Sequence, residues 1–169
     1  SASASVGSEP PPPPPVVSSA PPKADPIDAL VGQWKSEAGT EFLAVRVGDK
    51  VEFRVVDPKQ LAPADYVAGE ARFVLRKGDS DTTFLVEEKM RPQATLPFDP
   101  KSRTSCQEIW TEVDNKPLVA SLAAGELQVD FAKLFFSDKN FKIEDDRIVS
   151  CSKLAGAARG RGRTTLKKS

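Results

Sequence analysis

Apolar and polar side chains alternate with a period of two through the middle of the chain, and this alternation limits the accessible folds more than any other feature. Residues 51–55 (VEFRV) alternate without a break, and residues 127–131 (LQVDF) do the same. A period of two places successive side chains on opposite faces of a β-strand, so that one face is buried and the other meets water. The region from 27 to 153 therefore predicts an all-β domain built from half-buried strands.

Turn-forming residues separate these segments at short intervals. Gly48-Asp49 suits a two-residue hairpin, because glycine reaches positive φ at little cost, and the run 77–81 is a second such turn. Because nearly every connection has the length of a hairpin, the order of segments predicts an antiparallel up-and-down meander. A meander this long must close into a small barrel, which we expect, or fold into a sandwich. We expect eight to ten strands, at residues 31–37, 41–47, 50–56, 67–76, 82–90, 104–113, 117–123, 126–136 and 140–152.

The two ends differ in composition from this middle region. Residues 1–26 contain nine prolines, and such a segment favours polyproline II and has too few apolar side chains to offset its ordering entropy. Residues 154–169 carry five cations and no acidic residue. We therefore expect a Pro-rich disordered tether at 1–26, the barrel domain at 27–153 and a basic Arg/Gly-rich disordered tail at 154–169.

The basic tail implies a surface of opposite charge. A tail of this kind contacts anionic lipid, polysaccharide or nucleic acid through charge alone. No aromatic side chain lies among its cations, so the stacking that accompanies single-strand recognition is missing. We expect weak contact with an anionic surface, and a solvated tail without a partner is the simpler alternative. The cations concerned are Arg159, Arg161, Arg163, Lys167 and Lys168.

The two cysteines of the chain indicate both how they pair and in which compartment the protein is found. Cys106 and Cys151 both lie in expected strands, and in an exported protein an even pair of this kind is most simply one disulfide. Two buried free thiols are the alternative. Two cysteines without histidine cannot complete a zinc site, and no CxxC redox motif is present. We therefore expect a Cys106–Cys151 disulfide and an oxidising compartment.

A short motif stands at the start of the first expected strand. Gly32-Gln33-Trp34 follows an apolar segment that suits a helical turn closing one end of a barrel. This start resembles the lipocalin and wider calycin group, in which the Trp packs over the closed base of an eight-stranded barrel and the Gly allows close approach. The resemblance implies that Gly32 and Trp34 are structural residues of the barrel base.

The same motif leaves alternatives open. Trp34 is equally suited to an ordinary place in the core, and periplasmic metalloprotease inhibitors of bacteria form small barrels with a similar start. The second lipocalin motif, Thr-Asp-Tyr, is absent from this chain. No residue stands out as the arginine that covers the Trp in lipocalins, although Arg147 lies late enough in the chain to take that place.

The N-terminal segment resembles mature bacterial lipoproteins just after their lipidated cysteine, because small residues at 1–5 precede a proline spacer. The resemblance implies a membrane tether through a lipidated N-terminus that is absent from this chain. Bacterial lipocalin-like lipoproteins share this tethered layout. We therefore expect an exported protein, either periplasmic or anchored to the outer membrane.

Catalytic chemistry has little support in this composition. The chain has no histidine, which removes the usual general base, the Ser-His and Cys-His nucleophile pairs and the commonest zinc ligand. Asp79 and Asp81 suit a solvated hairpin tip. Glu87 and Glu88 occupy opposite strand faces, so the inward carboxyl would have a raised pKa. No phosphate-binding loop or nucleophile elbow occurs. We expect no enzyme, no cofactor and no metal site.

Five large aromatic residues on the expected inward faces bear on what the barrel binds. They either line a ligand cavity or fill the barrel, since an eight-stranded barrel holds side chains or one small ligand. We expect filling, which favours a protein-interaction module, such as a complex subunit or an inhibitor. The alternative is a lipocalin-like carrier or sensor of a small apolar ligand. The residues are Phe53, Phe73, Phe84, Trp110 and Phe131.

The loop at 91–103 is the expected contact surface for another envelope protein. Its three prolines make it rigid, so little entropy is lost when it binds. Arg91, Leu96 and Phe98 are the partner-binding candidates, with Phe98 as the anchor because buried aromatic residues carry much of an interface's energy. The alternative is that Phe98 plugs the barrel mouth as local core.

Overall fold

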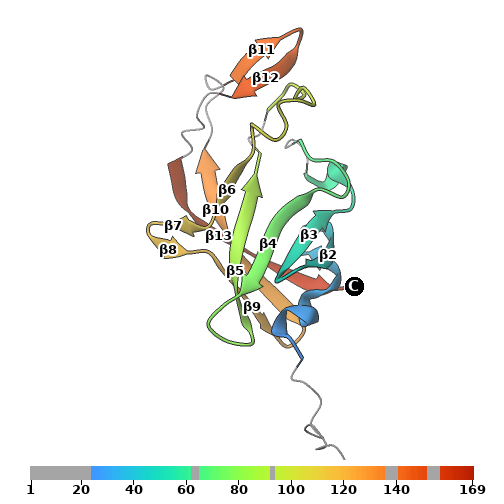
Figure 1. Ribbon diagram of the computed structural model, residues 1–169, viewed down its shortest axis with the longest axis vertical. Coiled ribbons are helices and arrows are strands. Elements are labelled where there is room, and N and C mark those ends of the chain that lie inside the picture. The colour runs from blue at the N-terminus through green and yellow to red at the C-terminus, as the bar shows by residue number, and fades with distance from the viewer. Residues whose placement is uncertain (1–23, 62–64, 92–93, 136–140, 152–156) are drawn as a thin grey trace, which may run out of the picture.

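The computed structural model describes residues 24–61, 65–91, 94–135, 141–151 and 157–169. Eight of its strands form a closed antiparallel barrel in which each strand pairs with the next along the chain, and the last returns to the first (Figure 1). This confirms the predicted all-β, up-and-down barrel. The barrel strands are β1 (Gly32–Ser36), β2 (Glu41–Val47), β3 (Lys50–Val55), β4 (Ala71–Lys77), β5 (Thr83–Met90), β9 (Val119–Ala123), β10 (Glu126–Phe135) and β13 (Ala157–Lys168).

Shorter elements decorate the barrel. The strand β6 (Glu108–Trp110) extends the sheet beside the end of β5, and β7 (Glu112–Val113) pairs with β8 (Lys116–Pro117) in a small hairpin. A second hairpin, β11 (Phe141–Glu144) with β12 (Arg147–Cys151), projects beyond one end of the barrel (Figure 1).

The helices are single turns of 3-10 type. The first, η1, spans Pro26–Leu30, and η2 spans Pro58–Leu61. Asp25 caps η1 by accepting a hydrogen bond from the backbone N–H of Ile27, and Pro26 occupies the first helical position, where its missing N–H costs nothing. No helix in the described part of the chain is long and apolar enough to cross a membrane.

Aromatic rings fill the barrel interior. The rings of Phe53 and Phe73 stack with centroids 4.5 Å apart, and Phe42 meets Phe73 edge-on at 5.4 Å. Phe84 is fully buried in the same core, as are Phe53 and Phe73. The prediction that inward aromatic residues fill the barrel is thereby confirmed for these three, while Phe131 and Trp110 pack against the core and are partly buried.

The prediction of a disordered C-terminal tail is wrong for residues 157–168. They form β13, which pairs with β10 on one side and with β1 on the other and so closes the barrel. Leu166 is fully buried, while Gly162 lies opposite Phe131 and Thr164 opposite Val129. Because neighbouring strands already supply bulky rings, β13 closes the barrel with mostly small inward residues, and its composition therefore lacked the usual apolar alternation. The domain extends past 153 to the end of β13.

A second, smaller core lies outside the barrel, in an arm made of residues 94–106 and the β11–β12 hairpin. The predicted disulfide between Cys106 and Cys151 is present and joins the two halves of this arm. Phe98, 5% exposed, packs with Cys106 and Ile148, and its ring meets Phe141 edge-on at 6.1 Å. Phe98 is therefore local core of the arm. The expectation that Phe98 is an anchor displayed to a partner is wrong. The alternative, that it is local core, is confirmed, but this core belongs to the arm and not to the barrel mouth.

Candidate binding site at the mouth of the barrel

The base of the barrel is sealed. Trp34 is 1% exposed, and its indole Nε1 donates a hydrogen bond to the carbonyl of Leu30 in η1 at 2.7 Å. The ammonium of Lys168 lies 5.6 Å from the Trp34 ring centroid and donates to the carbonyl of Ala29 at 3.1 Å. A side chain at Gly32 would begin 3.3 Å from Lys168 Cε. Gly32 and Trp34 are thus base residues, as the motif predicted.

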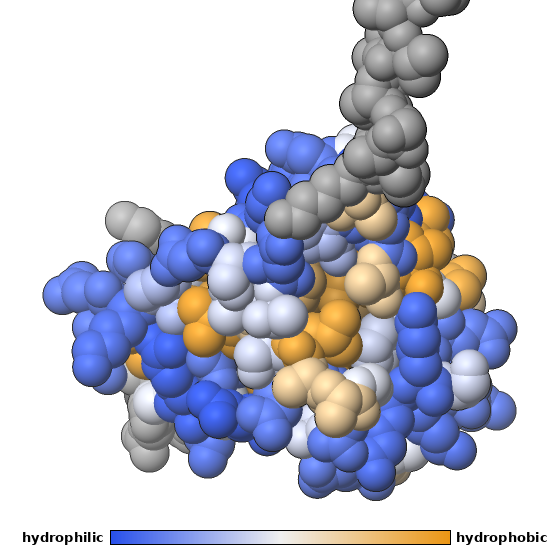
Figure 2. Space-filling view, turned by 90° about the horizontal axis from the view of Figure 1, so that it is seen from below, coloured by the Kyte–Doolittle hydropathy of each residue, from blue (hydrophilic) through white to orange (hydrophobic). Residues whose placement is uncertain are grey.

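Seen from this end, the molecule shows apolar side chains framed by hydrophilic ones (Figure 2). Two exposed valines adjoin η1 or its neighbouring strand, namely Val31 after η1 and Val47 at the end of β2. Scattered exposed apolar residues of this kind are normal on soluble proteins. The base therefore serves to pack and close the barrel.

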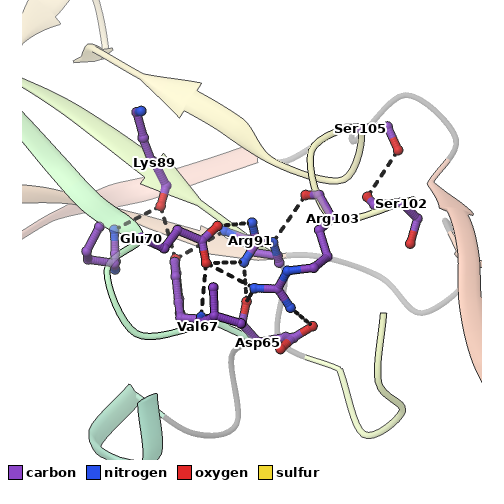
Figure 3. A network of polar contacts seen from close by, with 10 residues as sticks. Asp65, Val67, Glu70, Lys89, Arg91, Ser102, Arg103 and Ser105 are labelled. Atoms are coloured by element: carbon purple, nitrogen blue, oxygen red, sulfur yellow. Dashed lines mark hydrogen bonds and ion pairs between the residues drawn. The ribbon is translucent and has the colours of Figure 1, made fainter. Parts of the chain in front are cut away.

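At the opposite end, the mouth, an ion-pair network joins the two long loops. Arg91 contacts Glu70 with both of its terminal nitrogens, and Arg103 Nη2 donates to Glu70 Oε2 at 3.0 Å (Figure 3). Arg103 also pairs with Asp65. Tyr66 stands under this network, with the Arg91 guanidinium 5.3 Å from its ring centroid. These contacts hold the loops before β4 and after β5 in one arrangement.

The network sets the charge state of Glu70. Burial by itself would raise the pKa of Glu70, but hydrogen bonds from Arg91 and from the Val67 backbone N–H, with the positive charges of Arg91 and Arg103, outweigh it. The pKa of Glu70 is therefore below its ordinary value. Arg91, 2% exposed, is committed to this internal network, so the expectation that it contacts a partner is wrong.

A second pair lies deeper, at the upper end of the barrel interior. Glu88, on β5, is fully buried; one oxygen accepts from Arg72 Nη2 at 3.0 Å and the other from the backbone N–H of Ala132 at 2.7 Å. Burial raises the pKa of the Glu88 carboxyl, and the charge of Arg72 opposes that rise without cancelling it. Glu88 is thus the inward one of the two neighbouring glutamates, as the strand alternation predicted.

Beside Arg72 the mouth holds an open pocket of about 200 Å³. Phe42 and Phe131 supply its aromatic walls, and among the described residues that line it only Arg72 carries a charge. The guanidinium of Arg72 lies 5.5 Å from the Phe131 ring centroid and 5.6 Å from that of Tyr66. The described lining residues are Ser36, Ala38, Thr40, Phe42, Leu61, Arg72, Phe131 and Thr164.

The size of this pocket limits what it accepts. An apolar cavity of roughly 150 Å³ accepts benzene, whereas pockets for drug-sized ligands run from about 300 to 1,000 Å³. The mouth pocket therefore suits a single side chain or an equally small molecule, and a lipid acyl chain would have to displace the packed rings beneath it. No group of three or more metal-ligating side chains occurs among the described residues.

The predicted site residues are scattered relative to this pocket. Of the five aromatic candidates, Phe131 lines it; Phe53, Phe73 and Phe84 lie in the filled core, and Trp110 bonds through Nε1 to Glu108 on β6. Leu96, the remaining loop candidate, is half-buried in the arm.

No local sequence pattern pointed to Arg72 as a site residue. The pairing of β3 with β4 shifts register between Phe53 and Arg54, next to Ala71, and such an irregularity re-aims side chains at the end of a strand. Plain alternation would have placed Arg72 on the outer face, opposite to Phe73. Only the observed pairing of the strands shows that the guanidinium of Arg72 lies at the mouth.

The cations expected in a solvated tail also have fixed places. Arg161 and Arg163 both pair with the buried carboxylate of Asp130, at 3.4 and 3.1 Å, and Lys167 pairs with Glu126 at 3.3 Å. The premise of a flexible basic tail is therefore wrong for these three. Lys168 covers Trp34, and the side chain of Arg159 lies outside the described part.

The chain matches no known protein family, no curated protein and no solved structure.

Proposed function

We propose that this chain is a non-catalytic binding domain of the cell envelope that recognises another protein at the mouth of its barrel. The observation that carries the proposal is the filled interior: stacked Phe53 and Phe73 and the buried Trp34 and Phe84 occupy the volume that an internal ligand needs. Among the described residues, the mouth keeps an open pocket the size of one side chain. Hot-spot side chains of protein interfaces enter pockets of this kind.

The proposed barrel type is lipocalin-like. The closed eight-stranded barrel is compatible with that fold, and its base combines a single 3-10 turn, a buried Trp after Gly-x and a cation over the ring. In this proposal Lys168 stands where lipocalins have an arginine over the ring. The neighbouring elements η1 and β1 and the distant strand β13 all contribute to this base, which supports the resemblance carried by Gly32-Gln33-Trp34.

The proposed location is outside the cytoplasm. The disulfide between Cys106 and Cys151 supports this, because disulfides persist chiefly in oxidising compartments. The proline-rich composition of residues 1–22 suits a spacer between the domain and a membrane anchor. We extend the proposal to a lipoprotein tethered through a lipidated residue upstream of Ser1.

The alternative is a carrier or sensor of one small ligand, and the pocket beside Arg72 is the observation that favours it. A pocket of about 200 Å³ with two aromatic walls suits a molecule slightly larger than benzene. The two functions differ in what occupies the same space.

Site-specific photo-crosslinking in native envelopes separates them. A photoreactive residue at Ala38, an exposed residue of the pocket rim, should form a crosslink to one protein, and the same residue at Asp49, at the base, is the matched control. Filling the pocket with Ala38→Trp should abolish binding of that partner, while Asp49→Trp should leave it unchanged. A stoichiometric small molecule in native mass spectra, lost in Ala38→Trp, with no protein crosslinked at Ala38, would replace the proposal by the carrier alternative.

A further inference from the structure

We propose that the mouth pocket binds the C-terminal residue of its protein partner, with the terminal carboxylate on Arg72 and an apolar side chain between Phe42 and Phe131. This inference rests on the proposed function and names the chemistry of the partner. It follows from the donors, the walls and the size of the pocket.

Arg72 supplies hydrogen-bond donors to this pocket. A guanidinium has five N–H donors in a planar fork that matches a carboxylate. Arg72 uses two of them among the described residues, one to Glu88 Oε1 at 3.0 Å and one to the Lys89 carbonyl at 3.3 Å. Three N–H groups are therefore left on a guanidinium that lines the pocket.

Glu88 does not compete from inside the pocket. It is fully buried and absent from the described lining, and its second oxygen is satisfied by the Ala132 N–H at 2.7 Å. Its ion pair with Arg72 orients the guanidinium, as do the contacts of the guanidinium with the rings of Tyr66 and Phe131. A donor held in place in this way loses little entropy when an anion binds.

A hydroxyl adds to the anion site. The Ser36 hydroxyl oxygen accepts a hydrogen bond from the Thr40 backbone N–H at 3.0 Å, and no described residue accepts its proton. That proton is free to be donated to a second carboxylate oxygen. Thr164 brings another hydroxyl to the lining from β13, the strand that pairs with β1.

The walls and the size then favour a chain terminus over an acidic side chain. Asp and Glu carry their carboxylates on short stems with no apolar group beside them, whereas a C-terminal residue bears a carboxylate and a side chain on the same Cα. The pocket offers both counterparts, since Arg72 lies beside the aromatic walls of Phe42 and Phe131. Its volume of about 200 Å³ fits one such residue and little more.

The test uses three probes on the purified protein: acetyl-Gly-Gly-Phe with a free carboxylate, the same peptide as its C-terminal amide, and benzoate. Binding is followed by isothermal titration and by NMR shifts of the Thr164 and Ser36 amides. The free acid should bind about tenfold or more tightly than the amide, because hydrogen bonds to a charged group are the stronger kind. Benzoate should bind more weakly than the peptide acid.

Two variants make the result specific. Arg72→Gln combined with Glu88→Gln removes both charges of the pair while keeping hydrogen-bonding groups, and should bring the affinities for acid and amide within twofold of each other. Ala38→Trp should abolish binding of every probe with Arg72 intact. Circular dichroism checks that both variants are folded.

Each other outcome overturns the inference in a recognisable way. Equal affinity for acid and amide removes the carboxylate site. Binding of benzoate without the peptide points to a free small acid and to the carrier alternative. Binding of none of the probes, while Ala38 still crosslinks to a protein in native envelopes, rejects the terminal residue and leaves the proposed function standing.

Discussion

Replacing Trp34 should be among the most damaging single changes to this barrel. The side chain is 1% exposed, lies 6.3 Å from Phe53 between ring centroids and donates to the Leu30 carbonyl at 2.7 Å. Removing a buried aromatic side chain costs about 3–5 kcal/mol through lost burial and the cavity left behind. Trp34→Phe keeps most of the apolar volume but leaves the Leu30 carbonyl without its donor, which costs about 1–3 kcal/mol. Trp34→Ala should therefore lose more stability than Trp34→Phe.

Urea unfolding followed by far-UV circular dichroism measures these differences. The control is Ile109→Ala, since Ile109 is 60% exposed and its truncation should change the free energy of unfolding by about 0.5 kcal/mol or less. A loss below about 1 kcal/mol for Trp34→Ala, with an unchanged denaturant slope, would refute the argument. It would mean that η1 and Lys168 do not close the base as a packed unit.

Three further predictions concern the disulfide, the buried carboxyl and the last strand. Replacing Cys106 and Cys151 by Ser should lower the free energy of unfolding by about 4 kcal/mol on the chain-entropy model, because the bond joins residues 45 positions apart. A melting temperature equal to that of the unmodified protein under non-reducing conditions would contradict this. Because the pKa of Glu88 is raised on folding, the free energy of unfolding should fall as pH rises from the ordinary glutamate range through the pKa of Glu88 in the folded protein, and Glu88→Gln should remove that fall. Parallel pH profiles of melting temperature for the two proteins would count against this prediction. Deleting residues 161–169 should abolish cooperative unfolding, as judged by circular dichroism, since it removes most of β13 and leaves β1 and β10 without their shared partner; a cooperative melt in the truncated chain would show that the barrel closes without it.

Local patterns were sufficient for most of the barrel strands. Residues 50–56 were expected as a strand and β3 spans Lys50–Val55, because the alternation of Val51, Phe53 and Val55 with charged residues is a property of near neighbours. The span 104–113 was a poorer prediction, since only β6 and the two residues of β7 are strand there.

The errors share a physical cause, which is that burial depends on partners that the local pattern does not contain. The composition of residues 154–169 is that of a soluble tail, yet Arg161 and Arg163 become strand residues because Asp130 on β10 meets their charges. Phe98 has the pattern of a displayed anchor, yet Ile148, 50 positions later, and the disulfide cover it.

By itself the sequence determined the strand periodicity and the inward aromatic residues, which follow from side chains and backbone preferences within a few positions of one another. The cysteine pair followed from the presence of only two cysteines, and the base role of Trp34 from the resemblance of its motif. Only the tertiary structure decided which strand closes the barrel, which cation covers Trp34 and where Arg72 points. Those outcomes depend on contacts between distant segments, such as that of Lys168 with the Ala29 carbonyl 139 positions earlier, and such contacts form only when the whole barrel closes.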